Sequence, residues 1–251
     1  MTSVEIPEFA PPPEPPPMSE GSRLLNIFFS PGKAFADIAR RPRWWTPVIL
    51  AALVTTAYLY QFSQRVGWEL FFRQQNAQNL QLQQLDGAAR ARAEALQMML
   101  AKYLTWVSGL IGPLIAALII AAVLKFFADT IMCAGIGYKK TLAAVTYGTL
   151  PNLLKTGLAM LVMLLKPADE FDLQNPVMVN AALFVPSDAA AWIKGLAASF
   201  DLFTFWCMAL IAIGIAAGAK RMSAGKAFGM ILFPWILMVI LGAGFTAAFR
   251  S

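Results

Sequence analysis

One lysine lies in the middle of a long apolar stretch, where a charged side chain is costly. Lys155 is about ten residues from the end of the stretch 141–165, which places it near the centre of a bilayer if the stretch is a helix rising roughly 1.5 Å per residue. A lysine at that depth costs about 2.5–3.5 kcal/mol on insertion scales. Two interpretations stay open. The ammonium group either reaches the interface or contacts carbonyls freed near Pro151, or it faces a cavity and binds an anionic group together with Asn152, one turn earlier.

Two carboxylates lie near the ends of apolar stretches. Asp129 follows Lys125 by one helical turn, a spacing that predicts an ion pair, with a cation or proton site as the alternative. Asp201 opens the stretch 200–219, where a carboxylate complements the helix dipole. Lys155, Asn152 and Asp129 therefore form a candidate intramembrane polar site.

Other kinds of chemistry find little support in the sequence. The chain contains no histidine, and its two cysteines, Cys133 and Cys207, lie in apolar stretches typical of buried small side chains. No metalloprotease, phosphate-binding or nucleophile-elbow motif is present, and no nucleic-acid-binding module is recognisable. We therefore expect no catalytic residues, no metal site, no cofactor and no nucleic-acid partner.

The composition indicates that a bilayer surrounds most of the chain. Of 251 residues, 58% are hydrophobic and only 14% are charged, against roughly 25% charged residues in soluble domains. The net charge of +6 comes from basic residues spread beside apolar stretches, which favours anionic lipid headgroups as the partner. Five apolar stretches approach the roughly 20 residues needed to span a membrane. They cover residues 45–63, 104–125, 141–165, 200–219 and 227–249.

The predicted fold class is therefore all-α, a polytopic membrane helix bundle of about five transmembrane helices with an N-terminal amphipathic interfacial helix. The long segment 64–103 is predicted to be helical, with a turn at Asp86-Gly87, whereas 166–199 looks mostly irregular because it contains three prolines. Prolines at 113, 151 and 234 should kink the spans in which they lie.

The N-terminal part divides into a tail and a membrane domain. Residues 1–22 are rich in Pro and Glu and are predicted to be disordered, and 23–251 should form the membrane domain. Ser30 and Pro31 suit the start of a helix over 31–41, with basic residues opposite an apolar face and two tryptophans after it. The expected interfacial, lipid-binding residues are Lys33, Arg40, Arg41, Arg43, Trp44 and Trp45.

Two further features concern packing and orientation. Gly214 and Gly218 form a GxxxG pattern that predicts close helix packing, either within the chain or in association with itself or other membrane proteins. The basic residues at 23–43 and in the tight loop Lys220–Lys226 place the N-terminus in the cytoplasm and the C-terminus on the opposite side. The membrane would be the cytoplasmic (inner) membrane of a bacterium.

The stretch from Arg23 to Pro47, RLLNIFFSPGKAFADIARRPRWWTP, resembles the opening of prokaryotic members of the Yip family. A second stretch, Gly135 to Pro151, is similar to the family's Gly-Tyr turn and following helix. The resemblance implies five spans with the N-terminus in the cytoplasm. Eukaryotic relatives bind Ypt/Rab GTPases and membrane-shaping components, but their Asp-Leu-Tyr-Gly-Pro segment is missing from this sequence, which argues against small-GTPase binding.

The sequence supports two hypotheses of different classes. The first is a non-enzymatic membrane scaffold or adaptor that organises membrane or recruits partner proteins through its basic N-terminal helix and packing faces. The second is a small transporter or channel subunit with a polar path around Lys155.

Overall fold

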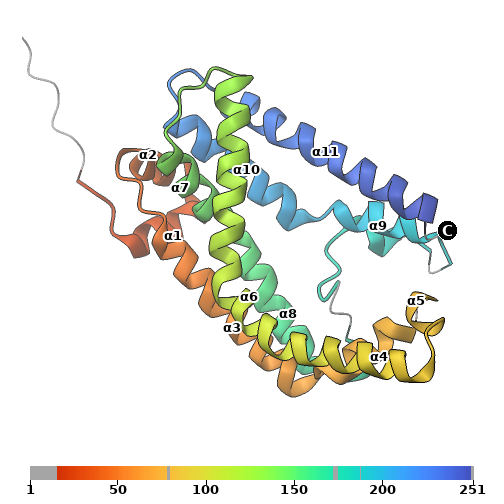
Figure 1. Ribbon diagram of the computed structural model, residues 1–251. Helices are drawn as coiled ribbons and strands as arrows, with labels where there is room; N and C mark the ends of the chain where they lie inside the picture. Colours follow the sequence, from red (N-terminus) through yellow and green to blue (C-terminus); the bar gives the residue numbers. More distant parts are fainter. Residues whose placement is uncertain (1–15, 78–79, 172–174, 187, 250–251) are drawn as a thin grey trace, which may run out of the picture.

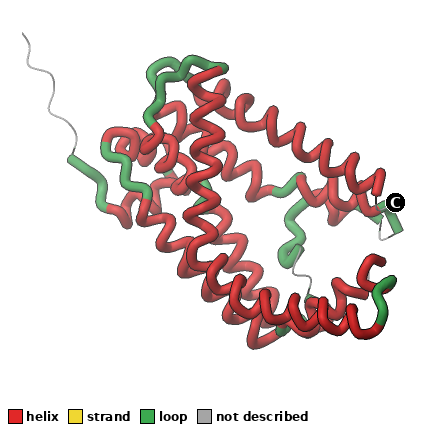
Figure 2. The backbone as a smooth tube through the Cα atoms, viewed as in Figure 1, coloured by secondary structure: helices red, strands yellow, loops and turns green. Residues whose placement is uncertain are grey.

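The computed structural model describes residues 16–77, 80–171, 175–186 and 188–249, and these residues form helices and loops without a β-strand (Figures 1 and 2). The prediction of an all-α fold is thus confirmed. In chain order the α-helices are α1 (Glu20–Phe29), α2 (Pro31–Arg40), α3 (Trp45–Arg65), α4 (Trp68–Ala77), α5 (Leu80–Gln83), α6 (Gly87–Thr130), α7 (Tyr138–Gly148), α8 (Pro151–Leu165), α9 (Ala191–Ser199), α10 (Leu202–Gly218) and α11 (Ala224–Phe249). Two short 3-10 helices, η1 (Ala168–Glu170) and η2 (Ala181–Phe184), lie before α9.

Among the described residues, four helical stretches are long and apolar enough to cross a membrane. They are Trp45–Arg65, Tyr103–Thr130, Tyr138–Leu165 and Ala224–Ala247. The third combines α7 and α8, which Pro151 separates because proline cannot continue the hydrogen-bond ladder of a helix. All five predicted stretches contain helices, but α10 has only 17 residues. At about 1.5 Å per residue it is roughly 25 Å long, shorter than a typical hydrocarbon core.

Helix α6 continues well beyond its apolar part. Asp86 caps its first turn by accepting a hydrogen bond from the Ala89 amide at 2.7 Å, so the predicted turn at Asp86-Gly87 is where this helix starts. The helix has 44 residues and contains Pro113 in its interior. Its length of about 66 Å exceeds twice the thickness of a hydrocarbon core. Its N-terminal turns therefore project towards α4 and α5, as Figure 1 shows.

One predicted boundary needs correction. The tail was expected to extend to residue 22, but α1 begins at Glu20 because Ser19 caps it, its hydroxyl accepting a hydrogen bond from the Ser22 amide at 3.2 Å. Residues 1–15, which hold most of the predicted tail, lie outside the described residues. Segment 166–199 is mostly irregular as predicted, with the two 3-10 helices and, at its end, α9 as its helical elements among the described residues. Ser30 does precede α2 as predicted, but its side chain makes no capping hydrogen bond.

Helix α10 lies at the centre of the bundle and packs against α2, α7, α8 and α11. Eight of its 17 residues are buried, and this burial explains how a helix of such uniform hydrophobicity is accommodated. The predicted GxxxG pattern is used within the chain. A Cβ atom on Gly214 would lie 2.7 Å from the Phe35 ring and 2.8 Å from the Ala144 methyl group, and one on Gly218 would lie 3.0 Å from Ile136.

We predict that Gly214→Ala destabilises the protein because a methyl group has no space between α2 and α7. The expected loss is about 1–3 kcal/mol, the usual range for overpacking a filled core, measured as a lower midpoint of thermal unfolding in detergent. Gly242→Ala on α11 is the matched control, since a Cβ there would meet nothing within 4 Å. Equal stability of the two variants would contradict the close contact at Gly214.

Candidate functional site

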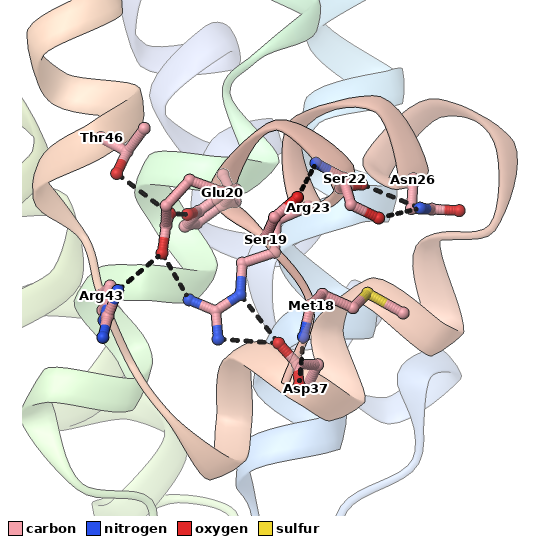
Figure 3. A network of polar contacts seen from close by, with 10 residues as sticks. Met18, Ser19, Glu20, Ser22, Arg23, Asn26, Asp37, Arg43 and Thr46 are labelled. Carbon is pink, nitrogen blue, oxygen red and sulfur yellow. Dashed lines mark hydrogen bonds and ion pairs between the residues drawn. The ribbon is translucent and has the colours of Figure 1, made fainter. Parts of the chain in front are cut away.

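A buried ion pair joins the two N-terminal helices. Arg23 of α1 donates from Nε to Asp37 Oδ2 at 2.8 Å, and its Nη2 lies 2.7 Å from the same oxygen (Figure 3). The side chains of Arg23 and Asp37 are only 2% and 4% exposed. Because both side chains are buried, water solvates neither charge, and each charge is stabilised by the charge-assisted hydrogen bonds to the other.

Glu20 extends this pair into a network that reaches two further helices. Its Oε1 lies 2.9 Å from Arg23 Nη1 and 3.6 Å from Arg43 Nη1. Its Oε2 accepts hydrogen bonds from the Thr46 hydroxyl at 3.0 Å and from the Tyr147 hydroxyl at 2.6 Å. One carboxylate therefore connects α1 with the start of α3 and with α7. Figure 3 shows how Thr46, Arg43 and Arg23 converge on it.

The environment of Glu20 keeps its carboxylate ionised. Burial by itself raises the pKa of this carboxyl group, but the hydrogen bonds from Tyr147 and Thr46 and the charges of Arg23 and Arg43 outweigh it and lower the pKa below its ordinary value. The pKa of Arg23 is raised further above its already high value: desolvation opposes this, and the hydrogen bond and charge of Asp37 outweigh it. Both groups are thus charged at neutral pH.

Local sequence explains how these charges come together. Glu20 and Arg23 are separated by three residues and so share one side of α1. Asp37 lies one turn from Ala34 on the side of α2 that also carries Ile38, and all three residues are buried. The apolar side of α2 packs on α7 and α10, so Asp37 is carried into the protein together with its apolar neighbours.

The predicted basic residues lie on α2 and in the segment that follows it. The side chains of Lys33, Arg40, Arg41, Arg43 and Trp45 are exposed. On α1, Leu25 and Phe29 are 63% and 82% exposed. We call Leu25, Phe29, Lys33 and Arg40 the N-terminal surface. Trp44 differs from its neighbour because it is half-buried and packs against two buried clusters. Lipid binding by the predicted residues stays a prediction.

The intramembrane lysine has a partner within the protein. Lys155 Nζ on α8 lies 2.8 Å from Asp201 Oδ2, with side-chain exposures of 29% and 4%. The other oxygen of Asp201 accepts a hydrogen bond from the Thr204 amide at 3.1 Å, so the residue also caps α10 as predicted. Neither interpretation of Lys155 anticipated this arrangement, in which the anionic group that it binds belongs to the same chain.

The three residues of the predicted polar site make separate contacts. Asp129 pairs with Lys125, as its spacing predicted, and accepts a hydrogen bond from the Ile136 amide at 3.1 Å. Lys155 pairs with Asp201. Asn152 lines a cavity between α3, α6, α7 and α8. No two of these three residues therefore share a contact partner in the hydrogen bonds and ion pairs of the described residues. A shared function for them stays a prediction.

Sequence reasoning missed the network around Arg23. Arg23 was counted only among the basic residues that set the orientation in the membrane, and Asp37, Glu20 and Tyr147 were not singled out. One signal was available: Asp37 lies at helical spacing from Ala34 and next to Ile38 on the apolar side of the predicted helix 31–41, where a charge requires a partner. Nothing local to the sequence identified that partner as Arg23.

The helices that carry this network match a known family. The family model described as "Yip1 domain" matches residues 25–245. The chain belongs to the Yip1 domain family. The match includes α2 with Asp37, three of the four candidate spans in full and the fourth up to residue 245, while Arg23 lies two residues before its start. The Yip-family resemblance seen in the sequence is thereby confirmed.

A relative of this Yip1 domain protein is the "Membrane protein YknW" of Bacillus subtilis (strain 168). The two chains are 25% identical over 229 residues, which is 90% of this chain and 91% of the relative. No solved structure gives a significant match. The family, the relative and the apolar helices together identify this chain as an integral membrane protein.

We predict that Arg23→Met strongly destabilises the protein because it leaves the Asp37 carboxylate buried without its partner. Breaking a buried pair in this way costs about 3–5 kcal/mol, to be measured by unfolding of the purified protein. Arg73→Met is the matched control, since the Arg73–Glu69 pair is 73% and 77% exposed and should contribute under about 1 kcal/mol. A small loss for Arg23→Met would show that the pair is dispensable.

We also predict that Lys155→Met is destabilising, because Asp201 would remain buried and charged without a cation. The double variant Lys155→Met/Asp201→Asn should recover much of the loss, since asparagine still caps α10 but carries no charge. Unfolding of the single and double variants forms a mutant cycle that measures the coupling. Additive losses in the two variants would contradict a stabilising pair.

Proposed function

We propose that this Yip1 domain protein is a non-enzymatic membrane scaffold or adaptor, and that its N-terminal surface contacts anionic lipid headgroups and a partner membrane protein. The observation that carries the proposal is the contrast between the two sides of α1 and α2. One side holds the buried Arg23–Asp37 pair, which joins α1 to α2, and Glu20 links this pair to Tyr147 of α7. The other side leaves Phe29 and Lys33 exposed.

This contrast supports binding because the cost of ordering α1 and α2 is met by contacts inside the protein. A surface that is already rigid loses little conformational entropy when a partner binds. Exposed aromatic and aliphatic side chains next to basic ones also suit the boundary between acyl chains and anionic headgroups. Each basic residue near such a surface contributes about 1 kcal/mol.

The proposed location is the cytoplasmic membrane of a bacterium, with the N-terminus on the cytoplasmic side. The support is the concentration of basic residues at 33–43 and in the short connection between α10 and α11, since short cytoplasmic loops are enriched in Lys and Arg. Small-GTPase binding is not part of the proposal.

A transporter or channel role is less well supported. A polar path would need Lys155 to face a substrate, whereas its ammonium group is paired with Asp201, which is 4% exposed. Asp129 is likewise paired with Lys125 one turn away. These pairs neutralise the charges that the path was expected to use.

The scaffold role can be tested by photocrosslinking in intact cells. A benzoylphenylalanine residue at Phe29, which is 82% exposed, should crosslink to a discrete membrane protein. The same residue at Phe233 of α11, which is 72% exposed, is the matched control and should give lipid adducts. Deletion of residues 23–43 is unsuitable because it removes the buried Arg23–Asp37 pair.

Charge removal tests the basic residues separately. The double variant Lys33→Gln/Arg40→Gln should lower the yield of the Phe29 crosslink at least about threefold, because two favourable charges near an anionic surface are lost. Arg65→Gln/Arg92→Gln removes two exposed charges elsewhere and should leave the yield unchanged. If Phe29 gives only the lipid adducts seen at Phe233, the adaptor role is wrong.

A further inference from the structure

A cavity of about 230 Å³ lies between α3, α6, α7 and α8. This volume is far larger than the roughly 10–15 Å³ that one water needs. Its lining combines small apolar side chains with several threonines and one carboxamide. The residues are Pro47, Val48, Ala51, Thr55, Pro113, Ala116, Ala117, Ile120, Val145, Thr146, Thr149, Asn152, Leu153 and Thr156.

The cavity is formed entirely by residues of the candidate membrane spans. Every lining residue belongs to one of three candidate membrane spans, Trp45–Arg65, Tyr103–Thr130 or Tyr138–Leu165. Helices α6 and α8 both pack on α3, and the cavity lies where Pro113 of α6 and the break before Pro151 interrupt regular helix geometry. The alanines of α3 and α6 leave the space unfilled.

One end of the cavity is closed and the other is open at the surface of the protein. Pro47, Val145 and Thr146 are buried and form the closed end. Ala116, Ile120 and Asn152 also line the cavity but are exposed. Because these residues lie within the spans, the surface on which the cavity opens is one that acyl chains contact.

The polar groups of the cavity match a ligand that both donates and accepts hydrogen bonds. Three threonine hydroxyl groups already donate to backbone carbonyls. Thr146 donates to Ala143 at 3.2 Å and Thr156 to Asn152 at 2.9 Å. Thr149 donates to the carbonyls of Val145 and Thr146, both at 3.1 Å. The lone pairs of these hydroxyl oxygens can still accept hydrogen bonds.

The Asn152 side chain adds the complementary group. None of the hydrogen bonds within the described residues uses its carboxamide, although the backbone carbonyl of Asn152 accepts from Thr156. An amide group without a hydrogen-bond partner is unfavourable in an apolar medium. A ligand oxygen that accepts from Asn152 Nδ2, next to a ligand hydroxyl that donates to a threonine, would remove that cost.

No charged side chain is among the lining residues, so a phosphate or ammonium group would enter without a counter-ion. We propose that the cavity binds the polar end of a neutral lipid with a free hydroxyl group, of the diacylglycerol class. The hydroxyl group donates to the threonine lone pairs, an ester carbonyl accepts from Asn152, and the acyl chains leave past Ala116 and Ile120 into the bilayer. This proposal does not depend on the scaffold function.

The test is photolabelling of the full-length protein in phosphatidylcholine nanodiscs. The probe is a diacylglycerol with a diazirine close to its glycerol end, and labelled peptides are located by mass spectrometry. Labelling should fall on the segments 47–55, 113–120 and 145–156. Two matched probes, a triacylglycerol without the hydroxyl group and a phosphatidic acid with a charged headgroup, should label these segments at least about tenfold less.

Substitutions separate specific binding from general exposure to lipid. Asn152→Leu should reduce labelling by at least about threefold, the effect expected for one hydrogen bond in a membrane. Ala116→Phe should reduce it by blocking the opening, while Ile115→Phe is the control, because Ile115 is 51% exposed but does not line the cavity. Unchanged thermal unfolding establishes that each variant is folded.

Three results would overturn the proposal. The first is labelling of the three segments that is no stronger than elsewhere on the spans, as expected for a cavity that holds only water. The second is equal labelling by the triacylglycerol or phosphatidic acid probe. The third is undiminished labelling in both folded variants, Asn152→Leu and Ala116→Phe.

Discussion

The ion pair between Arg23 and Asp37 is the interaction on which the arrangement of the N-terminal part depends. Both side chains are withdrawn from water, and a buried charge is tolerated only with a close partner of opposite sign and further hydrogen bonds. Glu20 supplies the additional acceptor oxygens. It pairs with Arg23 and accepts hydrogen bonds from Tyr147 of α7 and Thr46 of α3, so these helices are linked to the pair. The requirement to pair these groups therefore selects one way for α1 and α2 to pack on the bundle.

That constraint explains how an amphipathic segment can serve two purposes. The apolar side of α2 completes the protein core, with Phe35 touching the surface that Gly214 leaves open on α10. Its basic side is consequently free to face headgroups or another protein. In a helix that bound lipid through its apolar side, that side would not be available to the core. Here packing against α7 and α10 has replaced the lipid as the partner of the apolar side.

Hydrocarbon offers no hydrogen-bond partner, so polar groups within the spans are expected to find partners in the protein. Lys155 is paired with Asp201, Lys125 with Asp129, and three threonines donate to carbonyls of their own helices. The hydroxyl of Thr56 and the carboxamide of Asn152 depart from this pattern, and Asn152 does so in a cavity that is open at the protein surface.

Periodicity, hydropathy and helix breakers in the sequence determined most of the fold, because these are local properties that the bilayer converts directly into helices. They located α3, the start of α6 at Asp86 and the ends of α7 and α8 around Pro151. Only the tertiary structure decided which distant groups meet. Tyr147 lies 127 residues from Glu20, and Asp201 lies 46 residues from Lys155. The same holds for the GxxxG pattern, which could have served a second subunit but packs on Phe35 and Ala144. Such choices depend on how whole helices pack and on the cost of burying each charge, and neither is encoded in local spacing.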